Sequence, residues 1–260
     1  MGKIIACVNQ KGGVGKTTVT INLGIGLARA GKKVLLIDFD PQGSMTDCMG
    51  FPEPDTMEVT IAQILMNRIN DVEMDKEYGI LKHPEGVDVL PANIELSGLE
   101  VSLVNVMCRE LVLKGYLEQV KADYDYIVID CMPSLGLLTV NVLAAADGVI
   151  IPIKAEKPSI RGLQQLLRTI GKVRKSMNPD LGIEGIVPNM VSRTNYARDI
   201  VMRLTEAYGG PLKIFESIPQ SVRMAETAAE GKSIFLHEAK GKPAQVYASL
   251  IREVLADEEQ

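Results

Sequence analysis

Short runs of apolar residues recur along the chain, and each is followed by turn-forming residues and then by a longer stretch with helical spacing. The clearest runs cover residues 4–8, 34–37, 126–129, 149–153 and 183–187. Runs that are continuously apolar and rich in Val and Ile are typical of strands buried on both faces, as in parallel sheets. The pattern therefore predicts an α/β fold, an open, mostly parallel, twisted sheet with helices on both faces.

Helical spacing fills the stretches between these runs. It predicts a helix over residues 17–30, which Gly31 ends as a C-terminal cap, and another over residues 61–68. The sequence contains no internal repeat, no low-complexity tract and no Pro/Gly/Ser linker long enough to separate two domains. We therefore interpret residues 1–260 as a single domain.

The segment from about residue 50 to residue 105 is the least regular part of the sequence. It carries much of the acidity, at Glu53, Asp55, Glu58, Asp71, Glu73, Asp75 and Glu77. Charge-rich connections usually form solvated surface, so a surface insertion is expected here. A surface on which a partner docks is the alternative.

The composition excludes several classes of protein. The chain has 260 residues, 46% of them hydrophobic. Its four cysteines form no CxxC pair, and it contains only two histidines. A disulfide framework or a zinc cluster is therefore not expected. No run approaches the ~18 apolar residues of a membrane span, and the first residues lack the apolar core of a signal peptide. We expect a cytoplasmic protein that does not bind membranes.

A segment rich in glycine and lysine follows the first apolar run and opens directly into a helix. Glycines let the backbone curl so that successive N–H groups face phosphate oxygens, and the helix N-terminus adds partial positive charge. The standard pattern GxxxxGK[ST] has glycine where Gln10 stands, and this sequence adds a lysine, Lys11, at the start of the loop. The segment predicts a nucleotide-phosphate site formed by Gly12, Gly13, Val14, Gly15, Lys16, Thr17 and Thr18.

Within this loop, Lys16 is placed to reach the β- and γ-phosphates, and the Thr17 hydroxyl to coordinate Mg²⁺ directly. A glycine-rich surface turn explains the glycines but not Lys16 and Thr17 at the start of a helix. A dinucleotide-binding site finds support in Asp38, about 20 residues further on, but its GxGxxG spacing fails because the third position is Thr18.

Aspartates stand at the ends of two further apolar runs. Asp38 and Asp40 follow the second run, and Asp130 follows the third. Any one of them could be a helix cap or a turn former. Together at neighbouring strand ends they favour a magnesium shell, because bound Mg²⁺ keeps several waters that carboxylates hold.

With these motifs the sequence resembles the ParA/MinD family of deviant Walker A (P-loop) ATPases, and within it the ParA/Soj partitioning branch. The resemblance runs from Lys3 to about Leu255. At Met132 and Gln220 the chain departs from the proline and arginine usual in the family. The matching segments are 11–18, 38–43, Asp130 with Pro133 and Ser134, 145–152, 192–194, Ile218 with Pro219, and Val222 with Arg223.

The resemblance implies an ATP hydrolase that uses ATP and Mg²⁺, is weak unless a partner and DNA stimulate it, and forms a sandwich homodimer with ATP. Lys11 would cross to the phosphates of the partner subunit, and Asp40 would position the attacking water. Asp38 and Asp130 would hold magnesium-bound waters. Asn189 would contact the adenine, and Pro219 would complete the nucleotide site.

Charge is divided unevenly between the two halves of the chain. Residues 1–149 hold 12 Lys+Arg and 20 Asp+Glu, a balance of −8, whereas residues 150–260 hold 16 and 13, a balance of +3, and the sum is the net charge of −5. Local charge, rather than the total, controls binding within ~8 Å at physiological salt. The second half can therefore present a basic surface to a polyanion.

A helix predicted over residues 159–176 carries a basic stripe at helical spacing, formed by Arg161, Arg168, Lys172 and Lys175. Its opposite side is apolar, with Leu163, Leu166, Leu167, Ile170 and Val173. Such a stripe is usually a solvated face, but the resemblance implies non-specific binding of double-stranded DNA by the dimer. No base-reading motif appears. Further candidates for DNA contacts are Arg193, Arg198, Arg203 and Arg223.

Three functions remain open on the sequence. The first is a nucleoid-associated ParA-like ATPase that segregates or positions a plasmid, a chromosome origin or another cargo with a ParB-like centromere-binding or adaptor protein. The second is a MinD-like ATPase that positions its cargo at a membrane. The acidic end that follows the amphipathic stretch 246–255 argues against this, because it would repel anionic lipid. The third is a nucleotide-gated scaffold with little turnover.

Overall fold

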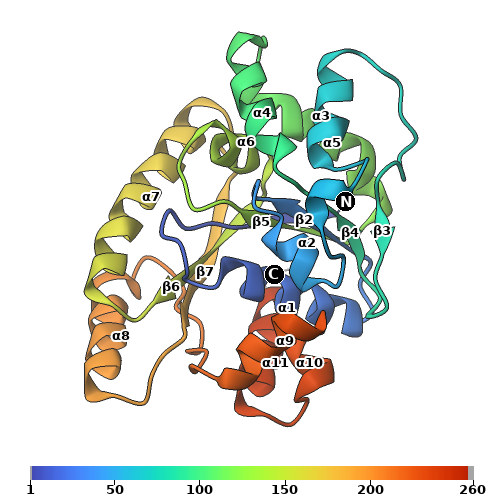
Figure 1. The fold of residues 1–260 in the computed structure, drawn as a ribbon. Helices are drawn as coiled ribbons and strands as arrows, with labels where there is room; N and C mark the ends of the chain where they lie inside the picture. The colour runs from blue at the N-terminus through green and yellow to red at the C-terminus, as the bar shows by residue number, and fades with distance from the viewer. Residues whose placement is uncertain (1, 257–260) are drawn as a thin grey trace.

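Seven strands form one sheet in the order β3-β4-β2-β5-β1-β6-β7 (Figure 1). The computed structural model describes residues 2–256, and for residues 157–161 it describes the backbone alone. All neighbouring strands are parallel except β3 and β4, which are antiparallel at one edge. The strands are β1 (Lys3–Cys7), β2 (Val34–Phe39), β3 (Leu81–Lys82), β4 (Asp88–Leu90), β5 (Tyr126–Cys131), β6 (Gly148–Lys154) and β7 (Gly182–Asn189).

Helices cover both faces of this sheet, as the sequence predicts. Apolar residues of α3, α4, α5, α6 and α7 pack on one face, and those of α1, α2, α10 and α11 pack on the other. The helices are α1 (Lys16–Arg29), α2 (Ser44–Cys48), α3 (Ile61–Ile69), α4 (Glu95–Ser102), α5 (Val112–Val120), α6 (Leu137–Ala145), α7 (Lys157–Ser176), α8 (Asn195–Tyr208), α9 (Val222–Glu230), α10 (Ile234–His237) and α11 (Lys242–Ala256).

The alternation of side chains along each strand divides the core into two layers. In β1, Ile4 and Ala6 belong to the layer under α3–α7, whereas Ile5 and Cys7 belong to the layer under α1 and α11. Because both layers are dry, strands that face them have no polar side, and this explains the continuous apolar runs. The layers hold the carboxyl ends of the central strands at one edge of the sheet.

The expected strands and helices are present, with small differences at their ends. β2 and β5 extend to Phe39 and Cys131, so Asp38 and Asp130 lie inside the strands rather than at their tips. Gly31, with φ of +86°, follows the end of α1 in the left-handed conformation of a helix cap. Among the described helices, none is long and apolar enough to cross a membrane.

The acidic segment differs from the expected surface insertion. It contributes β4, which pairs with β2 inside the sheet, and α3, whose Ile61 and Leu65 are buried. The sequence hides this because β3 and β4 are only two and three residues long. Strands this short give no periodic signal and form only because a neighbouring strand is present.

The packing of α1 on β2 offers a test of the sheet core. Leu36 is fully buried, and a Cβ placed on Gly24 of α1 would lie 2.3 Å from its Cδ2 atom. Because the site cannot collapse without moving α1, we expect Leu36→Ala to lower the free energy of unfolding by ~2–5 kcal/mol in urea denaturation. Leu236→Ala, at an exposed position, serves as the control and should cost no more than ~0.5 kcal/mol. Equal losses in the two variants would contradict this packing.

Candidate functional site

The parallel register of three central strands brings the candidate site together. Cys7 of β1 pairs with Asp130 of β5, and Asp130 pairs with Asp38 of β2. The glycine-rich loop follows β1, so it lies beside both aspartates at the carboxyl edge of the sheet (Figure 1). Ligands of open α/β sheets bind at this edge. The register thus assembles the residues that the sequence analysis selected.

The loop has the backbone conformation of a phosphate cradle. Gly13 and Gly15 have φ values of +70° and +83°, which side chains rarely adopt. A Cβ on Gly15 would also lie 2.2 Å from the amide nitrogen of Asn189. No described residue accepts a hydrogen bond from the backbone N–H groups of Gly12, Gly13 or Gly15. With α1 beginning at Lys16, these groups fit an anion with several oxygens.

Two side chains at the start of α1 face the site. The Lys16 Nζ atom lies 3.5 Å from the Lys11 carbonyl oxygen, and the residue is buried. The Thr17 hydroxyl donates to Asp130 Oδ2 at 2.6 Å. Thr20, one turn later, donates to the Lys16 carbonyl and lies 3.4 Å from Asp130 Oδ1. The first turn of α1 is therefore bonded to the end of β5.

Asp38 and Asp130 are both almost fully buried, at 0% and 1% exposure. Burial raises the pKa of each carboxyl, and for Asp130 the neighbouring charge of Asp38 adds to the increase. Two buried carboxylates beside a hydroxyl are hard oxygen ligands, the type of group that binds Mg²⁺ directly or through water. A divalent cation would relieve their repulsion, so the donor set fits this ion.

Asp40 lies in the turn after β2 and is half-buried. Its backbone N–H donates to Asp38 Oδ1 at 3.2 Å, and its own Oδ1 accepts from the Gln42 N–H at 3.0 Å. These bonds form two consecutive side-chain turns of the kind that aspartate favours. Asp40 therefore lies beside the buried aspartates Asp38 and Asp130. Its role in positioning the attacking water stays a prediction.

Lys11 lies on the other side of the loop and is bonded to a residue that the sequence analysis did not select. Its Nζ atom lies 2.7 Å from Glu156 Oε2, and Lys154 Nζ lies 2.6 Å from Glu156 Oε1. Hydrogen bonds from Lys11 and Lys154 lower the pKa of Glu156 to about 2. Both partners in the Lys11–Glu156 contact are about one-third exposed. Exchange of such a partner costs little, because exposed ion pairs are weak.

Asn189 contacts the glycine loop at the end of β7, and Pro219 lies in a segment beside that end. Asn189 is buried, and its amide nitrogen donates to the Val14 carbonyl at 2.9 Å. Residues 218–220 run beside β7, with Pro219 bridged to Val191. Asn189 therefore holds the glycine loop in place, and its contact with adenine stays a prediction, as does the part of Pro219 in the nucleotide site.

The basic candidates fall on α7 and α8, on the β7 side of the molecule (Figure 1), on α9, and, for Arg193, on the segment just before α8. On α7, Leu163, Leu166, Ile170 and Val173 are buried as predicted. Arg161 lies among the residues whose side chains are not described. The candidates that are exposed, with no acidic partner among the described residues, are Arg168, Lys172, Lys175, Arg193 and Arg198.

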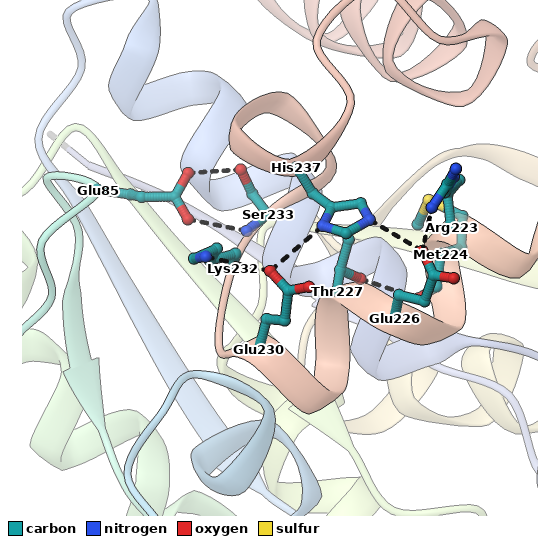
Figure 2. Close-up of polar contacts among 9 residues, drawn as sticks. All are labelled: Glu85, Arg223, Met224, Glu226, Thr227, Glu230, Lys232, Ser233 and His237. Atoms are coloured by element: carbon teal, nitrogen blue, oxygen red, sulfur yellow. Dashed lines mark hydrogen bonds and ion pairs between the residues drawn. The ribbon is translucent and has the colours of Figure 1, made fainter.

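Two other candidates have acidic partners. Arg203 lies 3.0 Å from Asp199, one turn earlier on α8. Arg223 Nη1 lies 2.9 Å from Glu226 Oε2. Figure 2 shows this contact in a network through which His237 also links α10 to α9. Part of the charge of these arginines is therefore already neutralised, which weakens their candidacy as DNA contacts.

Sequence reasoning missed three residues that hold this site. Glu156 follows strand β6, and the strand-end argument applied to the aspartates would have found it. Asn9, whose Oδ1 accepts from the Lys11 N–H and whose amide donates to Pro152, precedes the loop without a motif of its own. Thr46, which donates to Asp38, has no recognisable spacing.

Comparison with known proteins places this geometry in a family. Residues 2–183 match the family model described as an AAA domain. Sporulation initiation inhibitor protein Soj of Bacillus subtilis (strain 168) is 44% identical over 259 residues, covering 99% of this chain and 100% of Soj. Chromosome partitioning protein ParA of Myxococcus xanthus (strain DK1622) is 43% identical, covering 98% of this chain and 88% of that protein.

A solved structure shows the same fold. Cobyrinic acid a,c-diamide synthase of Mycobacterium smegmatis, crystallised with ADP and magnesium, superposes with a TM-score of 0.86 at 35% identity. The superposition covers 100% of this chain and 96% of that one. The likeness therefore extends over both the glycine loop and the C-terminal helices.

The Glu156 contacts give a test of the site by itself. Removing a cation that stabilises a carboxylate raises the pKa of the carboxyl group. We expect carbon NMR to place the pKa of Glu156 at about 2 in the native protein, and Lys11→Ala to raise it towards the ordinary value of 4.5. The ion pair therefore stabilises the folded protein at pH values above 4.5, the ordinary pKa of Glu156. This stabilisation is lost as the pH falls towards about 2, the pKa in the folded protein. Lys172→Ala, far along α7, is the control, and an unchanged pKa in Lys11→Ala would contradict the contact.

Proposed function

Because this chain belongs to the ParA/MinD family of P-loop ATPases, in its ParA/Soj partitioning branch, we propose that it hydrolyses ATP to move or position a DNA cargo. One observation carries this proposal. The glycine loop, with Lys11 at its start and Lys16 at its end, lies beside the paired aspartates Asp38 and Asp130. The relative named chromosome partitioning protein ParA, matched over 88% of its length, supports a DNA cargo.

ATP binds with its phosphates in the glycine loop. The N–H groups of that loop and Lys16 would neutralise phosphate charge, and Thr17 would coordinate the metal directly. Asp38 and Asp130 would hold waters of the metal shell. Mg²⁺, when bound, would supply neutralisation of phosphate charge. Asn189 and Pro219 border the position of the base.

Hydrolysis requires two further groups. Asp40 accepts a hydrogen bond from the attacking water and orients it towards the γ-phosphate. Lys11 leaves Glu156 and reaches the phosphates of the second subunit in an ATP-dependent homodimer, where it stabilises charge as an arginine finger does. Since Lys11 is held by an exposed ion pair, this exchange has a small cost. Turnover is then slow until dimer, DNA and a ParB-like partner are present together.

DNA binds to the basic residues of α7 and α8. Dimerisation doubles this surface, and neutralisation of several phosphates makes the affinity depend steeply on salt. Arg168, Lys172 and Lys175 lie along one helix without acidic partners among the described residues, which suits tracking of a phosphate backbone. Binding without base contacts is non-specific, as a carrier that moves over the nucleoid requires.

The catalytic assignment is tested by Lys11→Ala and Asp40→Ala. We expect both variants to bind a fluorescent ATP analogue within ~3-fold of the native affinity and to lose hydrolysis by ~100-fold or more, because each group acts on the transition state. Phosphate release measures turnover. Lys33→Ala and Asp47→Ala, which change exposed residues of the same types, are the matched controls. Near-normal turnover in either test variant would overturn its assignment.

The DNA surface is tested by reversing charge on α7 in the triple variant Arg168→Glu, Lys172→Glu and Lys175→Glu. Fluorescence anisotropy with random double-stranded DNA should show that the native protein binds with ATP but not with ADP. In the variant, the slope of log affinity against log salt should become shallower by ~0.9 for each DNA phosphate that these side chains neutralise in the native protein. The control reverses three lysines that lie outside α7 and α8, namely Lys76, Lys82 and Lys114, and should keep the native slope. Binding independent of ATP and salt, or binding to anionic vesicles instead, would contradict a DNA carrier.

A further inference from the structure

We propose that Thr46 is a positioning residue for magnesium, because it fixes the carboxylate of Asp38 in the orientation that holds the metal shell. Thr46 lies on α2, in the segment that follows the Asp40 turn, and it is fully buried. Thr46 lies outside the sequence motifs by which the nucleotide site is recognised. The inference rests on the proposed function and names a residue that acts on the metal only through Asp38.

Thr46 donates two hydrogen bonds to one oxygen of Asp38. Its backbone N–H lies 2.9 Å from Asp38 Oδ2, and its hydroxyl lies 2.8 Å from the same atom. Two donors that belong to one residue and converge on one oxygen fix both the position and the plane of the carboxylate group. Without the hydroxyl, the carboxylate would keep only the two backbone bonds, from the Thr46 N–H and the longer one from the Asp40 N–H.

The other carboxylate oxygen is thereby left for the metal shell. Asp38 Oδ1 accepts only the longer bond, 3.2 Å, from the Asp40 N–H among the described residues. A carboxylate oxygen has two acceptor positions, so Oδ2 is filled by Thr46 whereas Oδ1 retains capacity for a metal-bound water. Thr46 thus holds one carboxylate oxygen and leaves the other directed towards the metal shell.

The hydroxyl of Thr46 is itself fixed by a third bond. The Ala92 N–H, just after β4, donates to Thr46 Oγ1 at 3.1 Å, so the single hydroxyl proton is directed at Asp38. A Cβ on Gly43, which has φ of +59°, would lie 2.9 Å from the Ala92 carbonyl oxygen. The turn after β2, helix α2 and the end of β4 therefore form one rigid support behind Asp38. Residues that orient a metal's own ligands typically account for 10- to 100-fold in metal affinity or activity, and since Asp38 acts through water we expect an effect of ~10-fold.

The test compares Thr46→Ser with Thr46→Ala, which share the loss of the methyl group and differ only in the hydroxyl. Binding of a non-hydrolysable fluorescent ATP analogue is measured while Mg²⁺ is titrated. We expect Thr46→Ala to raise the Mg²⁺ concentration at half-binding by ~10-fold or more, and Thr46→Ser to stay within ~3-fold of the native protein. In turnover assays, Thr46→Ala should lower kcat more than it raises KM for ATP.

A control separates positioning from loss of stability. Thr227 is buried on α9, and its hydroxyl donates only to the Met224 carbonyl of the same helix among the described residues. Thr227→Ala should lower the unfolding midpoint in urea as Thr46→Ala does, yet leave the Mg²⁺ midpoint at its native value.

The outcomes distinguish this inference from the function on which it rests. If the native protein binds the ATP analogue without any dependence on Mg²⁺, the proposed function itself fails. If the native protein depends on Mg²⁺ but Thr46→Ala and Thr46→Ser share its midpoint, the positioning role is overturned and the function stands. A midpoint shifted equally in both variants, or in Thr227→Ala as well, also overturns the positioning role.

Discussion

Two buried carboxylates, Asp38 and Asp130, occupy paired positions on adjacent parallel strands, and the architecture of the site follows from the need to accommodate them. Like charges in a medium of low dielectric repel strongly, and each group has also lost its water. The surroundings compensate with donors and a cation, from Thr17, Thr46 and Lys16. A carboxylate pair of this kind is costly for a fold and useful for holding a divalent ion. The sheet register that creates the pair therefore defines the site.

The site combines a rigid part with an exchangeable part. The magnesium side is buried, and short hydrogen bonds across α1, α2, β2 and β5 fix it. The lysine side is exposed, and Lys11 contacts the Glu156 carboxylate, whose other oxygen binds Lys154. Buried bonds cost much to break and surface ion pairs cost little. An ATPase that assembles across two subunits needs this division, because metal geometry must persist while the lysine changes partner.

The strands that the sequence revealed are those buried on both faces, since only there does the hydrophobic effect demand an unbroken apolar run. β3 and β4 were not predicted, because strands of two and three residues show no hydrophobic pattern and form only by pairing with their neighbours. The same reason explains why the acidic segment looked like a surface insertion. The helix in this segment was predicted, over residues 61–68, but its packing against the sheet was not, because the sequence did not show that β4 pairs with β2.

The sequence by itself determined the local chemistry of this protein: a glycine loop that opens into a helix, and aspartates at the ends of apolar runs. Those features depend on residues within a few positions of each other, whose backbone conformation and spacing are set locally. Only the tertiary structure decided that Lys11 meets Glu156, that Asn189 holds Val14, and that Asp38 is fixed by Thr46. The first two contacts join residues 145 and 175 positions apart, and the third depends on how α2 folds back onto β2. Sheet order and helix packing create such contacts, and no local pattern encodes them.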